Sequence, residues 1–167
     1  MVITSSSDSS IKLQSGELSL SFAPKNSEGS SRSKSNILIK TSAKFDLPEG
    51  AADFCVYGPG EYEVKEIEIE GYEPFSYVVR MEEMRIGYLS SDALIDNLMG
   101  SEILITEGNP EFAKTIRQIE PMLIIVKEGD AKALAKELGV ELESTDKVSL
   151  KKKDLNNYPI LKVFALS

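Results

Sequence analysis

The sequence contains no histidine and no tryptophan, and its one cysteine is Cys55. Most zinc, copper and non-haem iron sites depend on imidazole ligands, so sites of that kind cannot form in this chain. A single cysteine cannot complete a Cys/His zinc site within one chain. The same absences exclude Ser-His-Asp and Cys-His catalysis. Any chemistry is left to carboxylates, lysine, tyrosine and the backbone, or to carboxylate-bound magnesium or calcium.

Basic residues and long apolar runs are also scarce. The chain has 19 Lys and Arg against 27 Asp and Glu, a net charge of −8, whereas binding to nucleic-acid phosphates needs a basic face. No apolar run approaches the roughly 20 residues that cross a membrane, and the start, MVITSSS, lacks the pattern of a signal peptide. One cysteine fits a reducing compartment. We therefore expect a cytoplasmic protein that binds neither nucleic acid nor membranes.

What is present is the composition of an ordinary globular protein. Of the 167 residues, 41% are hydrophobic and 28% are charged, which is enough to form a hydrophobic core. We expect a single domain over residues 1–167. Within it, residues 24–36 are rich in serine, interrupted by lysine and arginine, and this composition predicts a flexible loop.

Strand patterns dominate the first half of the chain. Apolar residues alternate on both sides of Ser15-Gly16, which predicts a hairpin over 11–22. In residues 61–70 the alternation changes phase, and a β-bulge near Lys65-Glu66 would bring the apolar side chains to one face. Further strands are predicted at 2–3, 37–39 and 54–57, and a second hairpin at 77–89 with its turn at Glu82-Glu83.

Helix and strand patterns alternate in the second half. A helix is predicted over 110–120 with Asn109 as its cap, and another over 130–138 that ends at Gly139. The strand 122–126 between them is apolar throughout, as expected where both faces of a sheet are covered. This order predicts a layered α/β or α+β domain. A short helix at 91–99 and strands at 103–105, 148–150 and 160–166 complete the expected elements.

Several stretches of the chain, in order, resemble one protein family. Residues 58–65 read GPGEYEVK and are similar to that family's GPGEYEVKG segment. Residues 84–89, MRIGYL, resemble the strand that leads into its GDLGH loop. Residues 101–105, 113–126 and 148–155 resemble later strands and a helix of the same family. The family is that of the small metallo-β-lactamase-fold proteins related to the UlaG-type zinc-dependent hydrolases.

The resemblance implies a four-layer αββα sandwich, in which two mixed sheets have helices outside and the active site lies at one edge, between the sheet ends. The chain is short for the family, which implies trimmed loops. The resemblance also implies two divalent metals, held by an HxHxDH loop after an apolar strand, by histidines of later loops and by a bridging aspartate. Such a pair of metals would share a hydroxide nucleophile.

The positions that correspond to these ligands hold other residues. Because no imidazole is left at any of them, we expect neither bound zinc nor a catalytic residue. The replacements are Thr41 and Ala43 at the first two histidines, Phe45 at the aspartate, Asp46 at the third histidine, Ser91 or Asp92 near the bridging carboxylate, and Glu128 near a later histidine.

Two main hypotheses follow. The first is a pseudoenzyme without a cofactor, which keeps the scaffold as a binding or assembly module for a protein partner or for a second copy of itself. The second is a hydrolase-like protein whose vestigial site holds Mg²⁺ or Ca²⁺, because these cations prefer carboxylate and water ligands. A nucleic-acid processing factor is a third hypothesis, against which the acidic charge counts. The carboxylates of the second hypothesis are Asp46, Asp92, Glu107 and Glu128.

Five glutamates also recur along residues 61–70, at positions 61, 63, 66, 68 and 70. Their spacing is typical of the solvated face of a strand, and this is the interpretation we adopt. The alternative is an acidic surface that docks a basic partner.

Overall fold

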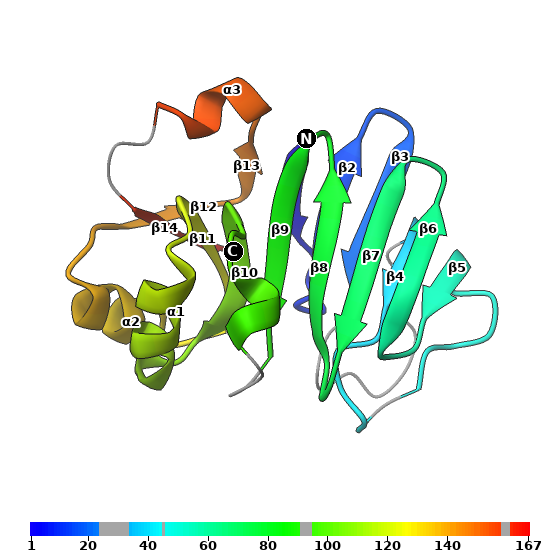
Figure 1. Cartoon of the computed structure of the whole chain (residues 1–167), viewed down its shortest axis with the longest axis horizontal. Helices are drawn as coiled ribbons and strands as arrows, with labels where there is room; N and C mark the ends of the chain where they lie inside the picture. Colours follow the sequence, from blue (N-terminus) through cyan, green and yellow to red (C-terminus); the bar gives the residue numbers. More distant parts are fainter. Residues whose placement is uncertain (24–33, 45, 91–94, 158–160) are drawn as a thin grey trace.

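The computed structural model describes residues 1–23, 34–44, 46–90, 95–157 and 161–167 of the chain. Over these residues the strands form two sheets (Figure 1). The order is β13-β1-β2-β3-β4-β5 in the six-stranded sheet and β12-β14-β11-β10-β9-β8-β7-β6 in the eight-stranded sheet. The six-stranded sheet consists of β1 (Val2–Ser5), β2 (Ile11–Ser15), β3 (Leu18–Phe22), β4 (Ser35–Ile39), β5 (Ala52–Val56) and β13 (Lys147–Ser149).

The eight-stranded sheet changes character along its width. Neighbouring strands from β6 to β9 are antiparallel, whereas those from β9 through β10, β11 and β14 to β12 are parallel. Its strands are β6 (Gly60–Val64), β7 (Ile67–Tyr72), β8 (Ser76–Met81), β9 (Met84–Leu89), β10 (Ile103–Gly108), β11 (Leu123–Gly129), β12 (Leu142–Thr145) and β14 (Lys162–Leu166).

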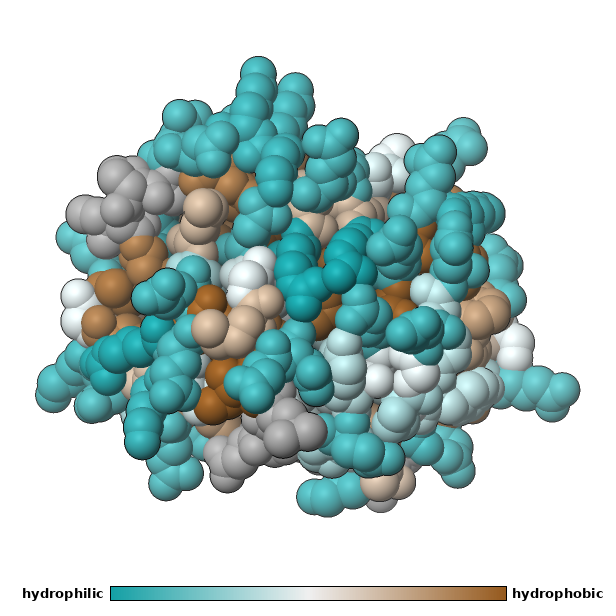
Figure 2. Space-filling model, in the orientation of Figure 1, coloured by the Kyte–Doolittle hydropathy of each residue, from teal (hydrophilic) through white to brown (hydrophobic). Residues whose placement is uncertain are grey.

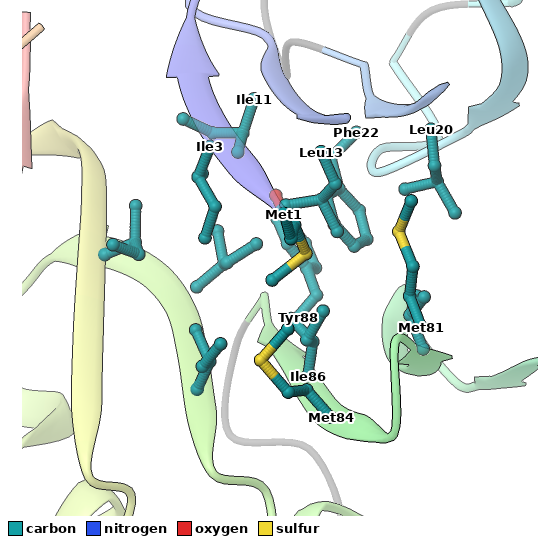
Figure 3. Close-up of a cluster of buried hydrophobic side chains, with 14 of the residues drawn as sticks. Met1, Ile3, Ile11, Leu13, Leu20, Phe22, Met81, Met84, Ile86 and Tyr88 are labelled. Atoms are coloured by element: carbon teal, nitrogen blue, oxygen red, sulfur yellow. The ribbon is translucent and has the colours of Figure 1, made fainter. Parts of the chain in front are cut away.

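The two sheets pack face to face around one apolar cluster. Alternate residues of each strand point into it, as the two-residue period of a strand requires. Figure 3 shows side chains from the first three strands, among them Leu13 and Phe22, directed toward Met84, Ile86 and Tyr88 of β9. All five are fully buried or nearly so. The space between the sheets is therefore the main hydrophobic core.

Both hairpins predicted for the first half of the chain are confirmed. β2 and β3 pair in register with Leu13 opposite Leu20, and Gly16 in the turn has a φ of +56°. β8 and β9 pair across Glu82 and Glu83, whose φ angles of 51° and 62° give the left-handed turn that two-residue hairpins favour.

The bulge predicted near Lys65-Glu66 is wrong, because the chain turns back at this point. β6 and β7 form a hairpin in which Val64 lies opposite Ile67, and Lys65 adopts a φ of 58°. The reversal restores the alternation, since residues opposite each other across a hairpin share a face. The apolar side chains of both strands consequently face the core, as the bulge was meant to achieve.

Among the described residues, the helices cover one part of the eight-stranded sheet. Side chains of α1 and α2 form a second apolar cluster with the outer faces of β10, β11 and β14. Asn109 and Asp130 accept hydrogen bonds from the backbone N–H groups of Glu111 and Ala133 at 3.0 and 2.9 Å. The Asn109 cap was predicted, whereas Asp130, expected as the first residue of its helix, is the N-cap of α2. The helical segments are η1 (Ile95–Leu98), η2 (Pro110–Phe112), α1 (Ala113–Ile119), α2 (Ala131–Leu138) and α3 (Lys152–Leu155).

Some segments differ from the sequence expectations. Ser35 and Asn36 belong to strand β4 and not to a loop, and most of the serine-rich segment, residues 24–33, lies outside the described residues. The short helix expected at 91–99 is a 3₁₀ segment over Ile95–Leu98, and residues 91–94, where it was expected to begin, are not among the described residues. β12 and α3 were not predicted. In the described part of the chain, no helix is long and apolar enough to cross a membrane.

Candidate functional site

The strand ends of both sheets converge where the resemblance places a site. Because β3 runs parallel to β4, and β9 to β10 and β11, the carboxyl ends of each group lie at one edge of their sheet. The backbone N–H of Ala23 donates to the carbonyl of Ile39 at 2.9 Å, which fixes the end of β3 beside β4. Ala23 therefore presents its own carbonyl at this edge.

Thr41, expected at the first ligand position, lies at the convergence. It is 1% exposed, and its hydroxyl donates to the carbonyl of Ala23 at 2.6 Å. A buried hydroxyl that already donates to a backbone carbonyl is a poor substitute for an imidazole ligand. Thr41 thus ties the loop after β4 to the end of β3.

Lys127 reaches the same carbonyl from the other sheet. It lies near the end of β11, is 6% exposed, and its ammonium Nζ is 3.4 Å from the carbonyl oxygen of Ala23. Nζ also lies 5.5 Å from the centre of the Tyr88 ring, within the range of a cation–π contact. Lysine is almost never this buried unless it is paired. The ammonium is therefore held as part of a structured cluster.

Aromatic rings form the floor of this cluster. Tyr88 stacks on Phe22 from the opposite sheet, with ring centres 4.7 Å apart and an interplanar angle of 13°. The Tyr77 hydroxyl donates to the carbonyl of Lys40 at 2.5 Å, which is a second link between the sheets. These rings fill the space beneath the strand ends.

The environment keeps the tyrosine hydroxyls protonated. Burial raises the pKa of Tyr88; hydrogen bonding with Thr41 acts in the opposite direction, and the carboxylates of Glu107 and Glu128 raise the pKa further. Burial likewise raises the pKa of Tyr77. Neither tyrosine is poised to act as a base near neutral pH.

Of the other predicted positions, two are exposed on the loop after β4, the half-buried Glu107 and Glu128 lie close enough to Tyr88 to raise its pKa, and the rest lie outside the described residues. Asp46 has a side chain that is 93% exposed and pairs with Lys40 at 2.7 Å; the hydrogen bond from Lys40 lowers the pKa of this carboxyl. Ala43 is exposed and has no donor atom, and Glu128 is half-buried. Phe45, Ser91 and Asp92 are not among the described residues.

These residues do not fit a pair of zinc ions. Within the described part of the chain, no three or more His, Cys, Asp or Glu side chains are grouped so that they could hold a metal. The position of Thr41 offers a hydroxyl that is already bonded, and Lys127 brings a positive charge to the same place. Among the described residues, the donor set that the resemblance implies is therefore not found.

The sequence expectations missed three members of the cluster, namely Lys127, Tyr88 and the carbonyl of Ala23. One signal could have found Lys127. Leu123 and Ile125 point into the core between the sheets, and the strand period places Lys127 on the same face.

A second surface feature lies on the outer face of β6 to β8. Figure 2 shows that this side of the molecule is largely hydrophilic, and a groove of about 440 Å³ is lined there by glutamates and Arg80. Arg80 pairs with Glu68 at 3.3 Å and also with Glu70. The glutamates at 61, 63, 68 and 70 thus form a solvated face, as expected, although they belong to two strands; Glu66 lies in the turn.

The two sheets, their mixed order and the few helices match the metallo-β-lactamase fold. Among solved structures, the chain is similar to a candidate Zn-dependent hydrolase of that superfamily from Thermotoga maritima, with a TM-score of 0.73 and 14% identity over 99% of this chain and 98% of the other. The expected fold class is therefore confirmed. Identity this low establishes the fold and not the activity.

Two further structures have the same fold. The metallo-β-lactamase fold protein YhfI from Bacillus subtilis matches with a TM-score of 0.59 and 9% identity, over 95% of this chain and 88% of that one. Igni18, a metallo hydrolase from Ignicoccus hospitalis, matches with a TM-score of 0.58 and 8% identity, over 90% and 99%. No protein-family model and no curated protein sequence matches the chain.

Proposed function

We propose that this protein is a non-catalytic metallo-β-lactamase-fold scaffold, a degenerate relative of the UlaG-type proteins that binds or assembles with other proteins in the cytoplasm. The observation that carries the proposal is the buried contact of Thr41 and Lys127 with one backbone carbonyl, at the place where metal ligands are expected. Neither group suits a metal, because the hydroxyl already donates to the carbonyl and an ammonium has no lone pair.

Electrostatics supports the same conclusion. Hydrolysis in this fold class needs cations that activate water, and Lys127 already contributes a positive charge at the convergence of strand ends. The aromatic floor of Tyr88 and Phe22 also occupies the space beneath it. What the chain keeps is the scaffold and its outer surfaces, which suit a protein partner or a second copy of the chain.

Metal content and turnover test this proposal directly. We expect elemental analysis of the purified protein to find far less than one zinc, manganese or iron per chain. We also expect no turnover of phosphodiester or lactone substrates above the buffer rate, with a metal-loaded hydrolase of the same fold as positive control. Stoichiometric metal together with turnover would overturn the proposal.

The carboxylate-cation hypothesis predicts a different result. A bound Mg²⁺ or Ca²⁺ would raise the melting temperature, because a ligand that binds only the folded state stabilises it. Asp46→Ala would abolish that rise, whereas Glu49→Ala, which removes a similar exposed charge from the same loop, would not. We expect the melting temperature to be unchanged by excess Mg²⁺, Ca²⁺ or Mn²⁺ in the wild type and in both variants.

A further inference from the structure

The position that corresponds to the metal site of the family the chain resembles contains a cation that belongs to the chain itself. Lys127 comes from β11 in the eight-stranded sheet, and the carbonyl it contacts belongs to Ala23, at the end of β3 in the six-stranded sheet. Thr41, from the loop after β4, donates to the same carbonyl. One oxygen atom thus joins three segments of the chain across both sheets.

We propose that the Lys127 ammonium is a built-in cation that replaces a metal ion structurally. It holds the ends of the two sheets together. The inference extends the proposed function, because it says what occupies the lost site. It depends on the positive charge of Lys127 and not only on the volume of its side chain.

The contacts of Lys127 are those that a cation makes. The carbonyl of Ala23 and the face of the Tyr88 ring both present negative potential to the ammonium. The carboxylates of Glu107 and Glu128 raise the pKa of Tyr88, so the ring that the ammonium contacts also lies in a negative potential. A neutral side chain of equal length would fill the space and leave the carbonyl and the ring without a positive charge beside them.

The position of Lys127 also explains how one side chain can act on both sheets. Its strand neighbours Leu123 and Ile125 point into the core between the sheets, so the lysine stem continues along that core to the edge. At the edge, the Tyr77 hydroxyl makes the parallel link from β8 to the carbonyl of Lys40. Lys127 and Tyr77 together connect the sheet ends on which a metal site would be built.

The first test removes the charge and keeps the size. Lys127→Met is compared with Lys147→Met, which replaces an exposed lysine of strand β13. We expect Lys127→Met to lower the melting temperature by about 5 to 10 °C and Lys147→Met by about 2 °C or less. Amide hydrogen exchange around Thr41 should accelerate only in the first variant. Equal melting temperatures for the two variants would overturn the inference.

The second test restores the cation from solution. Lys127→Ala leaves space for a small molecule, so n-propylammonium chloride should raise its melting temperature, while propan-1-ol of similar size and sodium chloride should not. Rescue by both organic molecules alike would mean that volume matters and charge does not, and absence of rescue would also count against the inference. If the alanine variant does not fold, refolding yield with each additive replaces the melting temperature as readout.

These results are independent of the tests for catalysis. A protein that carries no metal and hydrolyses nothing would still contradict the inference if Lys127→Met were as stable as Lys147→Met. Conversely, turnover with bound metal would overturn the proposed function whatever the melting temperatures are.

Discussion

The two halves of the eight-stranded sheet bury their inner faces in the same core, but their outer faces have different environments. In β10, β11 and β14, the outer side chains pack under α1 and α2, and the strands run parallel. In β6 and β7, the outer side chains other than Tyr72 are glutamates, three of them exposed and Glu70 half-buried, and the strands run antiparallel. Figure 1 shows the helices over the first half, with β6 and β7 uncovered.

The difference follows from the connections of the chain. Parallel neighbours need a crossover, and here the crossovers contain the helices that bury the outer face, so Ile124 and Val126 can be as apolar as Ile125 between them. Antiparallel neighbours need only a tight turn, which leaves the outer face in water and favours Glu68 and Glu70 there. Stability should therefore depend on outer-face residues in one half and hardly at all in the other.

The largest expected effect comes from removing the helix cover. Leu134 of α2 is fully buried in the apolar cluster beneath the helices. Leu134→Ala should lower the free energy of unfolding by about 2 to 5 kcal/mol, because the lost methyl groups leave a cavity. Urea unfolding measures this change.

The matched control lies on the outer face of the uncovered half. Glu63 is exposed on β6, and Glu63→Ala should change the free energy of unfolding by no more than about 0.5 kcal/mol. Similar losses in the two variants would show that the halves do not differ in the way proposed.

A smaller effect is expected at the start of α2. The Asp130 carboxylate accepts the N–H of Ala133 at 2.9 Å, and Asp130→Ala should cost about 1 kcal/mol. Lys132→Ala, at an exposed position in the first turn of the same helix, serves as control and should leave urea unfolding nearly unchanged. A loss at Asp130 no greater than at Lys132 would mean that the cap does not hold the helix cover in place.

How well the fold could be predicted also differs between the helix-covered half and the uncovered half of the eight-stranded sheet. The uninterrupted apolar run at 122–126 predicted a strand covered on both faces, and the structure agrees. The hairpin at Lys65-Glu66 was mistaken for a bulged strand because its turn contains no Gly, Asn or Asp, the residues that normally mark a left-handed turn. The turn at Glu82-Glu83 also lacks Gly, Asn and Asp. The apolar runs on both sides of it are, however, far enough apart to require a turn between them.

The candidate site was predictable only in part. The resemblance brought attention to Thr41 and to Glu128, and Lys127, the neighbour of Glu128 on β11, does converge with Thr41 on one carbonyl. It did not identify Lys127, since a lysine is expected in solvent unless the strand period is followed beyond the last apolar residue. The carbonyl of Ala23, which joins the cluster, is a backbone atom and leaves no trace in the sequence. Such tertiary acceptors become visible only when the strand ends are placed.

The smallest expected effect is the pH dependence of the uncovered face. The hydrogen bond from Tyr72, followed by the hydrogen bond and the positive charge of Arg80, lowers the pKa of Glu70 despite its partial burial. A carboxyl whose pKa is lower in the folded state stabilises the protein above its unfolded pKa, about 4.3, and this contribution is lost as the pH falls through the folded value. Glu70→Gln should therefore cost no more than about 1 kcal/mol at pH 7 and almost nothing at pH 3.

The measurement is urea unfolding of Glu70→Gln and of wild type at pH 7, 5, 4 and 3, and only the difference between the two proteins is interpreted, because the other carboxyls titrate in both. Glu63→Gln controls for the loss of one exposed negative charge on the same face. If the cost of Glu70→Gln were as large at pH 3 as at pH 7, the carboxylate would not be the source of the stability. A cost approaching that of Leu134→Ala would show instead that the uncovered face contributes as much as the helix-covered one, and the comparison of the two halves would fail.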